Sequence, residues 1–446
     1  MSLLKSVLFT GLILISAKAI SQQPAVHTFS LKDCIDYAMK NNVQVKNALL
    51  DIEIQKEDNR STTARALPNL SASGNYTGYV KIPTQLLPGE FFGQPAGTYV
   101  PVQFGTKYNA TGTVTLQQTL FDGQVFVGLQ ARRASIDYRQ KAQAITEDII
   151  RLNIYKIYYQ LVVSRTQIEQ LDANISRSKN LLHVTSEMYK NGFAEKIEAD
   201  KTSVQLANLE TEKSSALNSI RNGYYGLKFL MGMPQKDSLV LTDSVTEQQL
   251  KQGLLNEGIY DYNNRNDYQL METLNKLNEY NVKRYKLSYY PTLGVTGIYQ
   301  RSGQGNAFNV FSKGQWFTAS YIGLNLTVPI FSGFQKNADL KKARLQLQQS
   351  QNQLANLKDS IDQSIAKAVN DYHTAITTLD YQKKNVTLAE QVYAQSQKKY
   401  ESGLGSTLDI TNAQADLRVA QSNYVNAMYD AAIAKIDYLY AIGELK

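Results

Sequence analysis

The side chains best suited to catalysis or metal binding are scarce and scattered in this chain of 446 residues. Its three histidines, His27, His183 and His373, are far apart, and its one cysteine, Cys34, excludes an internal disulfide. A metal site needs several such ligands at close spacing. The sequence Gly303-Gln304-Gly305 begins like a dinucleotide-binding fingerprint but lacks its third glycine. The pattern therefore predicts neither an enzyme nor a metal or cofactor site.

Carboxylates are frequent, and two of them occupy matching places in a long internal repeat. The first copy contains Tyr189, Gly192, Glu198 and Gly232, and the second, 211 residues later, contains Tyr400, Gly403, Asp409 and Gly443. Long proline-free helical patterns flank residues 191–195 and 402–406, so both segments are predicted to be helix-to-helix turns. A repeat this long indicates two equivalent halves.

Composition and targeting signals place the protein outside the cytoplasm. Residues 1–22 read as a secretory signal peptide, with Lys5, an apolar run over residues 7–15 and the small residues Ala17 and Ala19. No other stretch approaches 18 consecutive apolar residues, so no transmembrane helix is predicted. The formal charge of +8 is spread among acids along polar helix faces, which argues against nucleic acid as a partner.

The first repeat is predicted to span residues 23–234. A helix over residues 31–66 ends at Pro68, and alternating polarity predicts strands over 69–80 and 110–120, with a loop over 81–107 between them. A helix over 124–189 would be about 100 Å long, a length typical of coiled coils and helical repeats. A return helix follows the turn and stops at Gly232.

The second repeat, over residues 265–446, follows a polar connector at 235–264 and has the same plan. A helix ends before Pro291, and strands are predicted over 292–300 and 319–330, within a hairpin of about 292–330 that matches the first at about 69–120. The next helix carries Leu340, Leu347, Leu354 and Ile361 at intervals of seven, which predicts a left-handed supercoil with its neighbours.

The four predicted strands suit an outer membrane. Strands of about ten residues can cross a membrane when tilted, but four are too few to close a barrel, so the chain must cover its edges or oligomerise. Aromatic residues near the strand ends suit an interfacial girdle, namely Tyr99, Phe104, Tyr108, Trp316, Phe317 and Tyr321. A soluble sheet with edge aromatics is the alternative, and two hairpins that each precede a very long helix make it less favoured.

Taken in order, these motifs resemble the TolC-like outer membrane efflux proteins, also called outer membrane factors. The resemblance covers nearly the whole mature chain. It rests on the strand entries Leu67-Pro68-Asn69-Leu70 and Tyr290-Pro291-Thr292-Leu293, on the strand exit at residues 328–333, and on Tyr400-x-x-Gly403-Leu404-Gly405-Ser406 followed by Leu408-Asp409.

The resemblance implies a mainly helical homotrimer in the outer membrane of a Gram-negative bacterium. Each chain would give four strands to a shared twelve-stranded β-barrel and its helices to a periplasmic coiled-coil barrel. The implied partners are a periplasmic adaptor protein and an inner-membrane pump of the resistance-nodulation-division or ABC type. The duct would work without cofactor or catalysis.

The resemblance also assigns two sets of site residues to the ends of the helices. The adaptor would contact the two turns at Gly192, Phe193, Gly403, Leu404, Gly405 and Ser406. A constriction would form at Asp409, with Glu198 and Asp200 as equivalents in the first repeat. Asn412 stands where the family places a second acid, which indicates a constriction less avid for cations.

Several alternatives stay open at this level. Asp409 also fits a plain role as an acid in the first turn of a helix, favoured by the helix dipole. The whole chain could instead be a periplasmic coiled-coil scaffold whose hairpins dock on another protein. Within the channel class, small-molecule efflux, metal-ion efflux and type I protein secretion are not distinguished.

Overall fold

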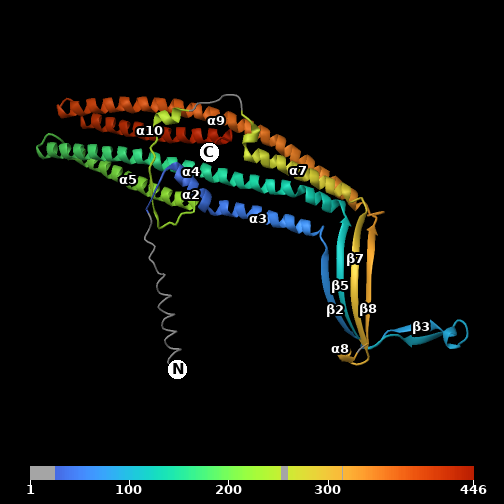
Figure 1. The fold of residues 1–446 in the computed structure, drawn as a ribbon. Coiled ribbons are helices and arrows are strands. Elements are labelled where there is room, and N and C mark those ends of the chain that lie inside the picture. Colours follow the sequence, from blue (N-terminus) through green and yellow to red (C-terminus); the bar gives the residue numbers. More distant parts are fainter. Residues whose placement is uncertain (1–25, 253–259, 314, 446) are drawn as a thin grey trace, which may run out of the picture. The chain divides into compact units, whose positions relative to one another are not determined.

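The computed structural model describes residues 26–252, 260–313 and 315–445, and the predicted signal peptide lies outside these ranges. The chain is mainly helical with a smaller β part, as predicted (Figure 1). It divides into two compact units. Unit 1 contains residues up to 50, 140–270 and from 354 on; unit 2 contains residues 51–139 and 271–353.

Unit 2 is built on one antiparallel sheet of four strands in the order β2-β5-β7-β8 (Figure 1). The strands are β2 (Asn69–Gly78), β5 (Tyr108–Phe121), β7 (Thr292–Gly305) and β8 (Gln315–Thr327). The strands nearer the C-terminus differ from the predicted bounds. β7 continues past residue 300, and β8 begins earlier than the predicted residue 319. β8 also ends before the predicted residue 330, because Pro329 cannot donate a ladder hydrogen bond.

The register of the sheet separates an apolar face from a polar one. Leu116 lies opposite Leu70 and Gly297, and Val295 lies opposite Leu324, so these side chains share one face. The opposite face carries mainly Asn, Ser, Thr and Gln in β2, β5 and β7, includes Phe317 and Tyr321 in β8, and has no charged residue. On the apolar face the only charged residue is Arg301. The sheet therefore offers a polar, uncharged surface on one side and an apolar surface on the other.

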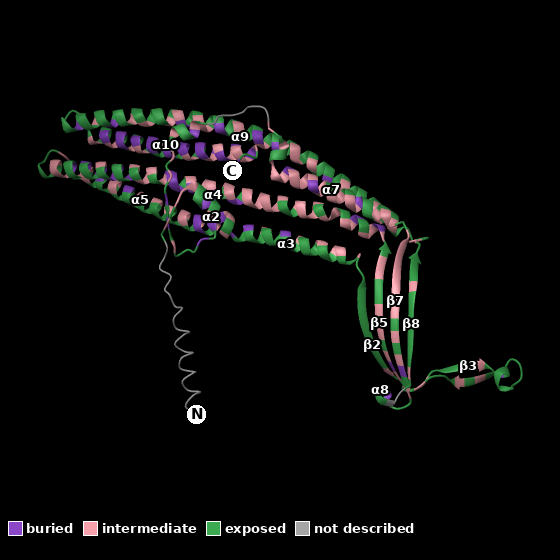
Figure 2. Ribbon diagram, viewed as in Figure 1, coloured by how far each residue is buried: buried purple, intermediate pink, exposed green. Residues whose placement is uncertain are grey.

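The two outer strands of this sheet are exposed along most of their length (Figure 2). Ile322 and Leu324 of β8 are 83% and 73% exposed, and Leu70 of β2 is 70% exposed. β2 pairs only with β5, and β8 only with β7, among the residues that the structure describes. Each outer strand therefore has one free edge of backbone donors and acceptors.

Long helices make up the rest of the chain. α3 (Val43–Ala64), α4 (Gly123–Lys190), α7 (Asn266–Leu287) and α9 (Gln335–Glu401) contribute to unit 2. α4 begins at a close approach to α7, because a Cβ at Gly123 would lie 2.7 Å from Leu287 Cβ. Only glycine fits at this position without a shift of the backbone.

Unit 1 packs α2 (Leu31–Asn41), α5 (Lys196–Met231) and α10 (Thr407–Ala441) with the later parts of α4 and α9. α10 is the most buried of these helices (Figure 2), and alanine is common on its buried face, for example Ala420, Ala427 and Ala431. Small side chains let neighbouring helices approach closely. Separate apolar clusters, rather than one continuous core, run along these helices.

The helix predicted over residues 31–66 is wrong in one respect, because it breaks at Asn42 into α2 and α3. The buried Asn42 side chain accepts hydrogen bonds from the amides of Gln44 (2.7 Å) and Val45 (3.2 Å), so it caps α3. Its Nδ2 donates to the carbonyl of Leu230, at the end of α5 (2.6 Å). The same side-chain amide thus caps α3 and donates to a carbonyl far away in the sequence. Sequence periodicity does not reveal either contact.

Two segments predicted to lack regular structure contain short strands. Within residues 81–107, β3 (Thr84–Pro88) pairs with β4 (Tyr99–Gln103) around the 3-10 helix η2 (Gly89–Phe92). The connector contains β6 (Ser238–Leu241), which pairs in parallel with β1 (Val26–Phe29). It also contains α6 (Glu247–Lys251) and η3 (Tyr262–Asn264). Strands of four or five residues leave too short a pattern to be recognised.

Replacing Asn42 by Ala is expected to destabilise the protein by about 2 kcal/mol, since α3 loses its cap and the carbonyl of Leu230 loses a partner. Denaturant unfolding of the detergent-solubilised protein, followed by circular dichroism, measures this loss. Gln44→Ala, at an exposed neighbouring position, is the control and should leave the midpoint nearly unchanged. Equal midpoints for the two variants would contradict the role of Asn42.

Candidate functional site

The first predicted turn follows α4 and reverses the chain into α5. Gly192 has a φ of 79°, in the left-handed region that favours glycine. The amide of Gly192 donates to the carbonyl of Tyr189 (3.0 Å), and that of Phe193 donates to the carbonyl of Met188 (2.8 Å). The Phe193 side chain is 80% exposed. The turn thus closes its own backbone and leaves an aromatic ring on the surface.

The second predicted turn, between α9 and α10, has the same backbone pattern. Gly403 has a φ of 75°, and the amides of Gly403 and Leu404 donate to the carbonyls of Tyr400 (3.0 Å) and Lys399 (2.9 Å). Leu404 is 84% exposed. A Cβ at Gly405 would lie 3.1 Å from the amide nitrogen of Tyr400, so this position also favours glycine. Both turns therefore present one large apolar side chain each.

The structure brings the two turns together through a short polar chain. Thr407 Oγ1 donates to Glu198 Oε2 (2.7 Å) and also lies 3.4 Å from the hydroxyl oxygen of Tyr400. The Tyr400 hydroxyl donates to the sulfur of Met188 (3.4 Å). These contacts join the start of α5 and the end of α4 to the second turn, so residues beside both turns meet at one site.

An apolar cluster lies beside these polar contacts. Tyr393 and Tyr400 of α9 pack with Leu181 of α4 and with the α10 residues Ile410, Ala413 and Leu417. The guanidinium of Arg177 lies over the ring of Tyr393, 5.6 Å from its centroid. The cluster holds α4, α9 and α10 together near the turns, while the polar chain links α5 to them.

The expected acidic residues differ in their surroundings. The Asp409 carboxylate accepts hydrogen bonds from the backbone amide (3.2 Å) and hydroxyl (2.8 Å) of Ser406, and the Ser406 hydroxyl caps α10 in return. The Ser406 hydroxyl, with its backbone N–H, lowers the pKa of Asp409. Glu198 is half-buried beside Thr407, whereas Asp200 and Asn412 are exposed. The role of Asp409 as a first-turn acid is therefore realised in the structure.

The six expected girdle aromatics divide among three places. Tyr108 and Trp316 lie on the apolar face of the sheet, opposite Gly78 and Gly303. Phe317 and Tyr321 lie on the polar face, because they alternate with Trp316 along β8. Tyr99 begins β4 in the separate two-stranded sheet, and Phe104 follows that strand.

Sequence reasoning missed two further aromatics on the apolar face. Tyr76 stacks with Tyr108, with ring centroids 6.2 Å apart, and Tyr299 of β7 lies on the same face. The guanidinium of Arg301 lies 5.5 Å from the ring centroid of Trp316. Strand register, rather than distance from a strand end, identifies these residues, and strict alternation along β2 and β7 is the sequence signal for them.

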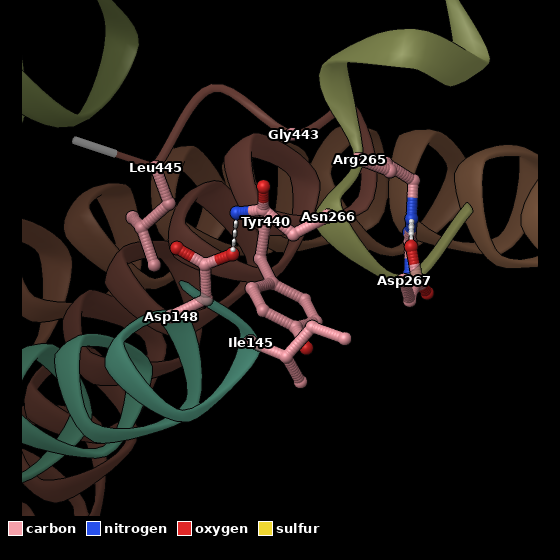
Figure 3. Close-up of a pocket in the computed structure, with 8 residues that line it drawn as sticks. All are labelled: Ile145, Asp148, Arg265, Asn266, Asp267, Tyr440, Gly443 and Leu445. Carbon is pink, nitrogen blue, oxygen red and sulfur yellow. Dashed lines mark hydrogen bonds and ion pairs between the residues drawn. The ribbon is translucent and has the colours of Figure 1, made fainter. Parts of the chain in front are cut away.

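Sequence reasoning also missed a polar cluster at the C-terminal end of α10 (Figure 3). Of its residues, only Gly443 was singled out from the sequence. Arg265 forms two hydrogen bonds with Asp267 (3.0 and 2.6 Å) and donates to the carbonyl of Ala441 (2.9 Å). Asn266 Nδ2 donates to Asp148 of α4 (2.7 Å). The cavity among these residues is about 30 Å³, which suits water rather than a larger ligand. The cluster is a joint that fixes the end of α10.

Neither a metal site nor a helical membrane span emerges from the described part of the chain. No group of three or more His, Cys, Asp or Glu side chains in residues 26–252, 260–313 and 315–445 could hold a metal ion. Within the same ranges, no helix has the length and apolar character needed to cross a membrane.

Comparison with known proteins identifies relatives over most of the chain. The profile of the family described as "Outer membrane efflux protein" matches residues 263–444. Outer membrane efflux protein BepC of Brucella suis biovar 1 is 23% identical over 99% of this chain and 89% of its own length. Outer membrane protein TolC of Salmonella enteritidis is 22% identical over 76% of this chain and 70% of its own.

Solved structures agree on the fold. The crystal structure of the outer membrane protein VceC from Vibrio cholerae matches with a TM-score of 0.73 at 18% identity, over 93% of this chain and 96% of that one. The family profile, the two curated relatives and the shared fold point to one group of proteins. Residues 263–444 thus match the outer membrane efflux protein family, and the chain over most of its length is similar to TolC-like outer membrane factors, which are proteins of the outer membrane.

Proposed function

We propose that this protein is the outer-membrane exit duct of a tripartite efflux or type I secretion system. Substrates delivered by a periplasmic adaptor and an inner-membrane pump would pass through it passively to the exterior. The observation that carries this proposal is the two-faced sheet. Its apolar face suits lipid, and its polar, uncharged face suits a water-filled lumen.

The free edges of the sheet support a homotrimer. Adjacent strands are antiparallel throughout, so β2 and β8 run in opposite directions and β8 of one copy can pair with β2 of the next. Within a bilayer, unpaired backbone groups cost several kcal/mol each, so an open sheet is excluded there. Three copies would give a closed barrel of twelve strands, above the smallest barrels of about eight.

The division of the aromatics supports the same orientation of the sheet. Tyr76, Tyr108, Tyr299 and Trp316 would face lipid, where aromatic rings suit the interface. Phe317 and Tyr321 would face the lumen among amides and hydroxyls. We therefore assign the girdle to the first group and place Phe317 and Tyr321 in the duct.

The paired turns are the proposed periplasmic tip. Phe193 and Leu404 are exposed apolar side chains on two adjacent turns, which suits docking of the adaptor. Together with Gly192, Gly403, Gly405 and Ser406 they form the adaptor-contacting surface. Asp409, Glu198, Asp200 and Asn412, at the starts of α10 and α5, are proposed to line the constriction in the closed trimer.

Opening of the tip would separate α5 from α9 and α10. The bond from Thr407 to Glu198 joins α10 to α5 and must break if the helix pairs splay, a rigid-element motion biased by the adaptor.

Relatives about 20% identical to this chain are named for cation efflux (CusC) and for protease secretion (PrtF). The inner-membrane pump would therefore decide which cargo this chain carries.

The test of the proposed function is the oligomeric mass and planar-bilayer conductance of the detergent-extracted protein. A trimer that forms small, cation-selective channels and runs as a heat-modifiable band is the expected result. A protein released from membranes by alkali, with no conductance, would instead identify a periplasmic scaffold.

Replacing Asp409 by Ala is expected to lower the cation selectivity of the channel, because three carboxylates leave the constriction. Single-channel reversal potentials under a salt gradient measure this change. Ser406→Ala is the matched control, since it removes the capping hydroxyl but keeps the charge. If both variants shifted selectivity equally, the effect would come from the loss of the cap rather than from charge at a constriction.

Thr407→Val is expected to favour the open channel, since Glu198 loses its hydrogen bond across the turns, worth about 1.5–3 kcal/mol for a charged acceptor. This energy corresponds to a rise of at least tenfold in the open-to-closed ratio measured in bilayers. Thr377→Val, on an exposed part of α9, is the control. Unchanged gating in Thr407→Val would rule out this bond as a restraint on the tip.

The stability supplied by the Ser406–Asp409 cap should depend on pH. Because the pKa of Asp409 is lowered on folding, its contribution is complete above the ordinary value of 3.8 and is lost as the pH falls through the lower folded value. The difference in thermal midpoint between the parent and Asp409→Asn should therefore be present at pH 6 and shrink as the pH falls below 3.8. A difference that stayed constant with pH would contradict the cap.

A further inference from the structure

A cavity of about 290 Å³ lies between α4, α5 and α10, in the half of unit 1 that contains the turns. Its polar lining comes from all three helices: Asn174 of α4, Lys201, Gln205 and Asn208 of α5, and Thr411, Gln414 and Arg418 of α10. This volume is far more than one water molecule needs and close to the lower limit of small-molecule sites.

Gln414 is the least expected residue of this lining. Its side chain is 2% exposed, and neither its Oε1 nor its Nε2 has a hydrogen-bond partner. Its neighbours on the buried face of α10 are apolar, including Ala413 and Leu417. An unsatisfied buried amide destabilises the fold, so an apolar residue would be more stable at this position unless something in the cavity binds the amide.

Some of the other polar atoms in the lining have hydrogen-bond partners and some do not. Asn174 is bonded on both sides, as donor to Gln421 (2.9 Å) and as acceptor from Arg177 (2.8 Å). Gln205 Oε1, in contrast, is buried with no partner. The unsatisfied atoms thus come from α5 and α10, which face each other across the cavity.

The charge of the lining selects the kind of ligand. Lys201 and Arg418 line the cavity and no carboxylate does. The nearest acid that the structure ties to this lining is Glu212, which accepts from Arg418 at 3.3 Å on the exposed side. Two cationic groups beside amide and hydroxyl donors are the arrangement that binds carboxylate or phosphate oxygens.

We propose that this cavity binds a small organic anion. Its carboxylate or phosphate oxygens would lie between Lys201 and Arg418, and the Gln414 amide would donate to it. A hydroxyl group of the ligand would supply a donor for the free oxygen of Gln414 or Gln205. Such a ligand would bridge α5 of the first repeat and α10 of the second, so it would stabilise the packed form of these helices.

This proposal is independent of whether the protein conducts, and it is tested on the full mature protein in detergent. Citrate is the probe, and sodium chloride at matched ionic strength is the reference. Isothermal titration calorimetry should show saturable citrate binding, and citrate should raise the thermal midpoint more than the reference salt does. Midpoints that respond equally to both salts, with no heat of binding, would overturn the proposal.

Variants place the bound citrate in this cavity. Lys201→Gln, at an exposed side chain that leaves the helix packing unchanged, and Gln414→Leu should each weaken citrate binding at least tenfold. Lys236→Gln removes an exposed charge outside the cavity and should bind citrate as the parent does. Retention of full affinity in Lys201→Gln and Gln414→Leu would show that citrate binds elsewhere. Gln414→Leu that is more stable than the parent in the absence of citrate would agree with an amide kept for binding.

Discussion

The helices of unit 1 depend on one backbone feature, the left-handed glycine that ends a helix. It occurs at Gly192, Gly232, Gly403 and Gly443, with φ between 68° and 79°. At each position the glycine amide donates three residues back, and the next amide donates five residues back. Two of these glycines reverse the chain at the turns, and the other two end α5 and α10. Each helix that returns from a turn, α5 or α10, thus lies between two left-handed glycines, one in the turn before it and one just after its last residues.

The two glycines that end α5 and α10 are also points of close packing. A Cβ at Gly232 would lie 2.4 Å from the carbonyl oxygen of Asn41, and one at Gly443 would lie 2.7 Å from that of Asn264. In each case the residue that follows this asparagine donates a hydrogen bond to a carbonyl at the end of the helix. Asn42 donates to the carbonyl of Leu230, and Arg265 donates to that of Ala441. Different side chains thus serve the same purpose at the ends of α5 and α10.

The sequence predicted the long-range plan better than the local detail. Long helices and alternating strands carry strong periodic signals, and the four glycines at one offset marked the turns. The break at Asn42 and the pairing of β1 with β6 were not predictable, because both depend on residues about 190 to 210 positions away. The predicted girdle shows a different limit of sequence reasoning. Position near a strand end does not decide which face a side chain occupies, and Phe317 and Trp316, adjacent in sequence, lie on opposite faces.

The packing of α4 against α10 is unusually polar for a helix interface. Asn174, Ser178, Gln414 and Gln421 are all at least 94% buried, and among these four residues the hydrogen bond between the two helices joins Asn174 to Gln421. Ser178 Oγ and both amide atoms of Gln414 lack partners. Polar layers contribute less to packing than apolar ones and penalise mismatched registers. An interface of this kind specifies one alignment of the helices without making their separation prohibitive, which suits the opening proposed for the tip.

The capping role of Asp409 and its proposed place in a constriction support each other. The bonds from Ser406 stabilise the charged form of the carboxylate and lower its pKa, so Asp409 is ionised at neutral pH. The same bonds hold the carboxylate against the first turn of α10 instead of letting it swing on a flexible turn. A fixed, permanently charged group is what a ring of three symmetry-related carboxylates needs in order to act on passing ions. The capping role of Asp409 therefore does not argue against the proposed constriction, because the cap fixes the position of the charged carboxylate.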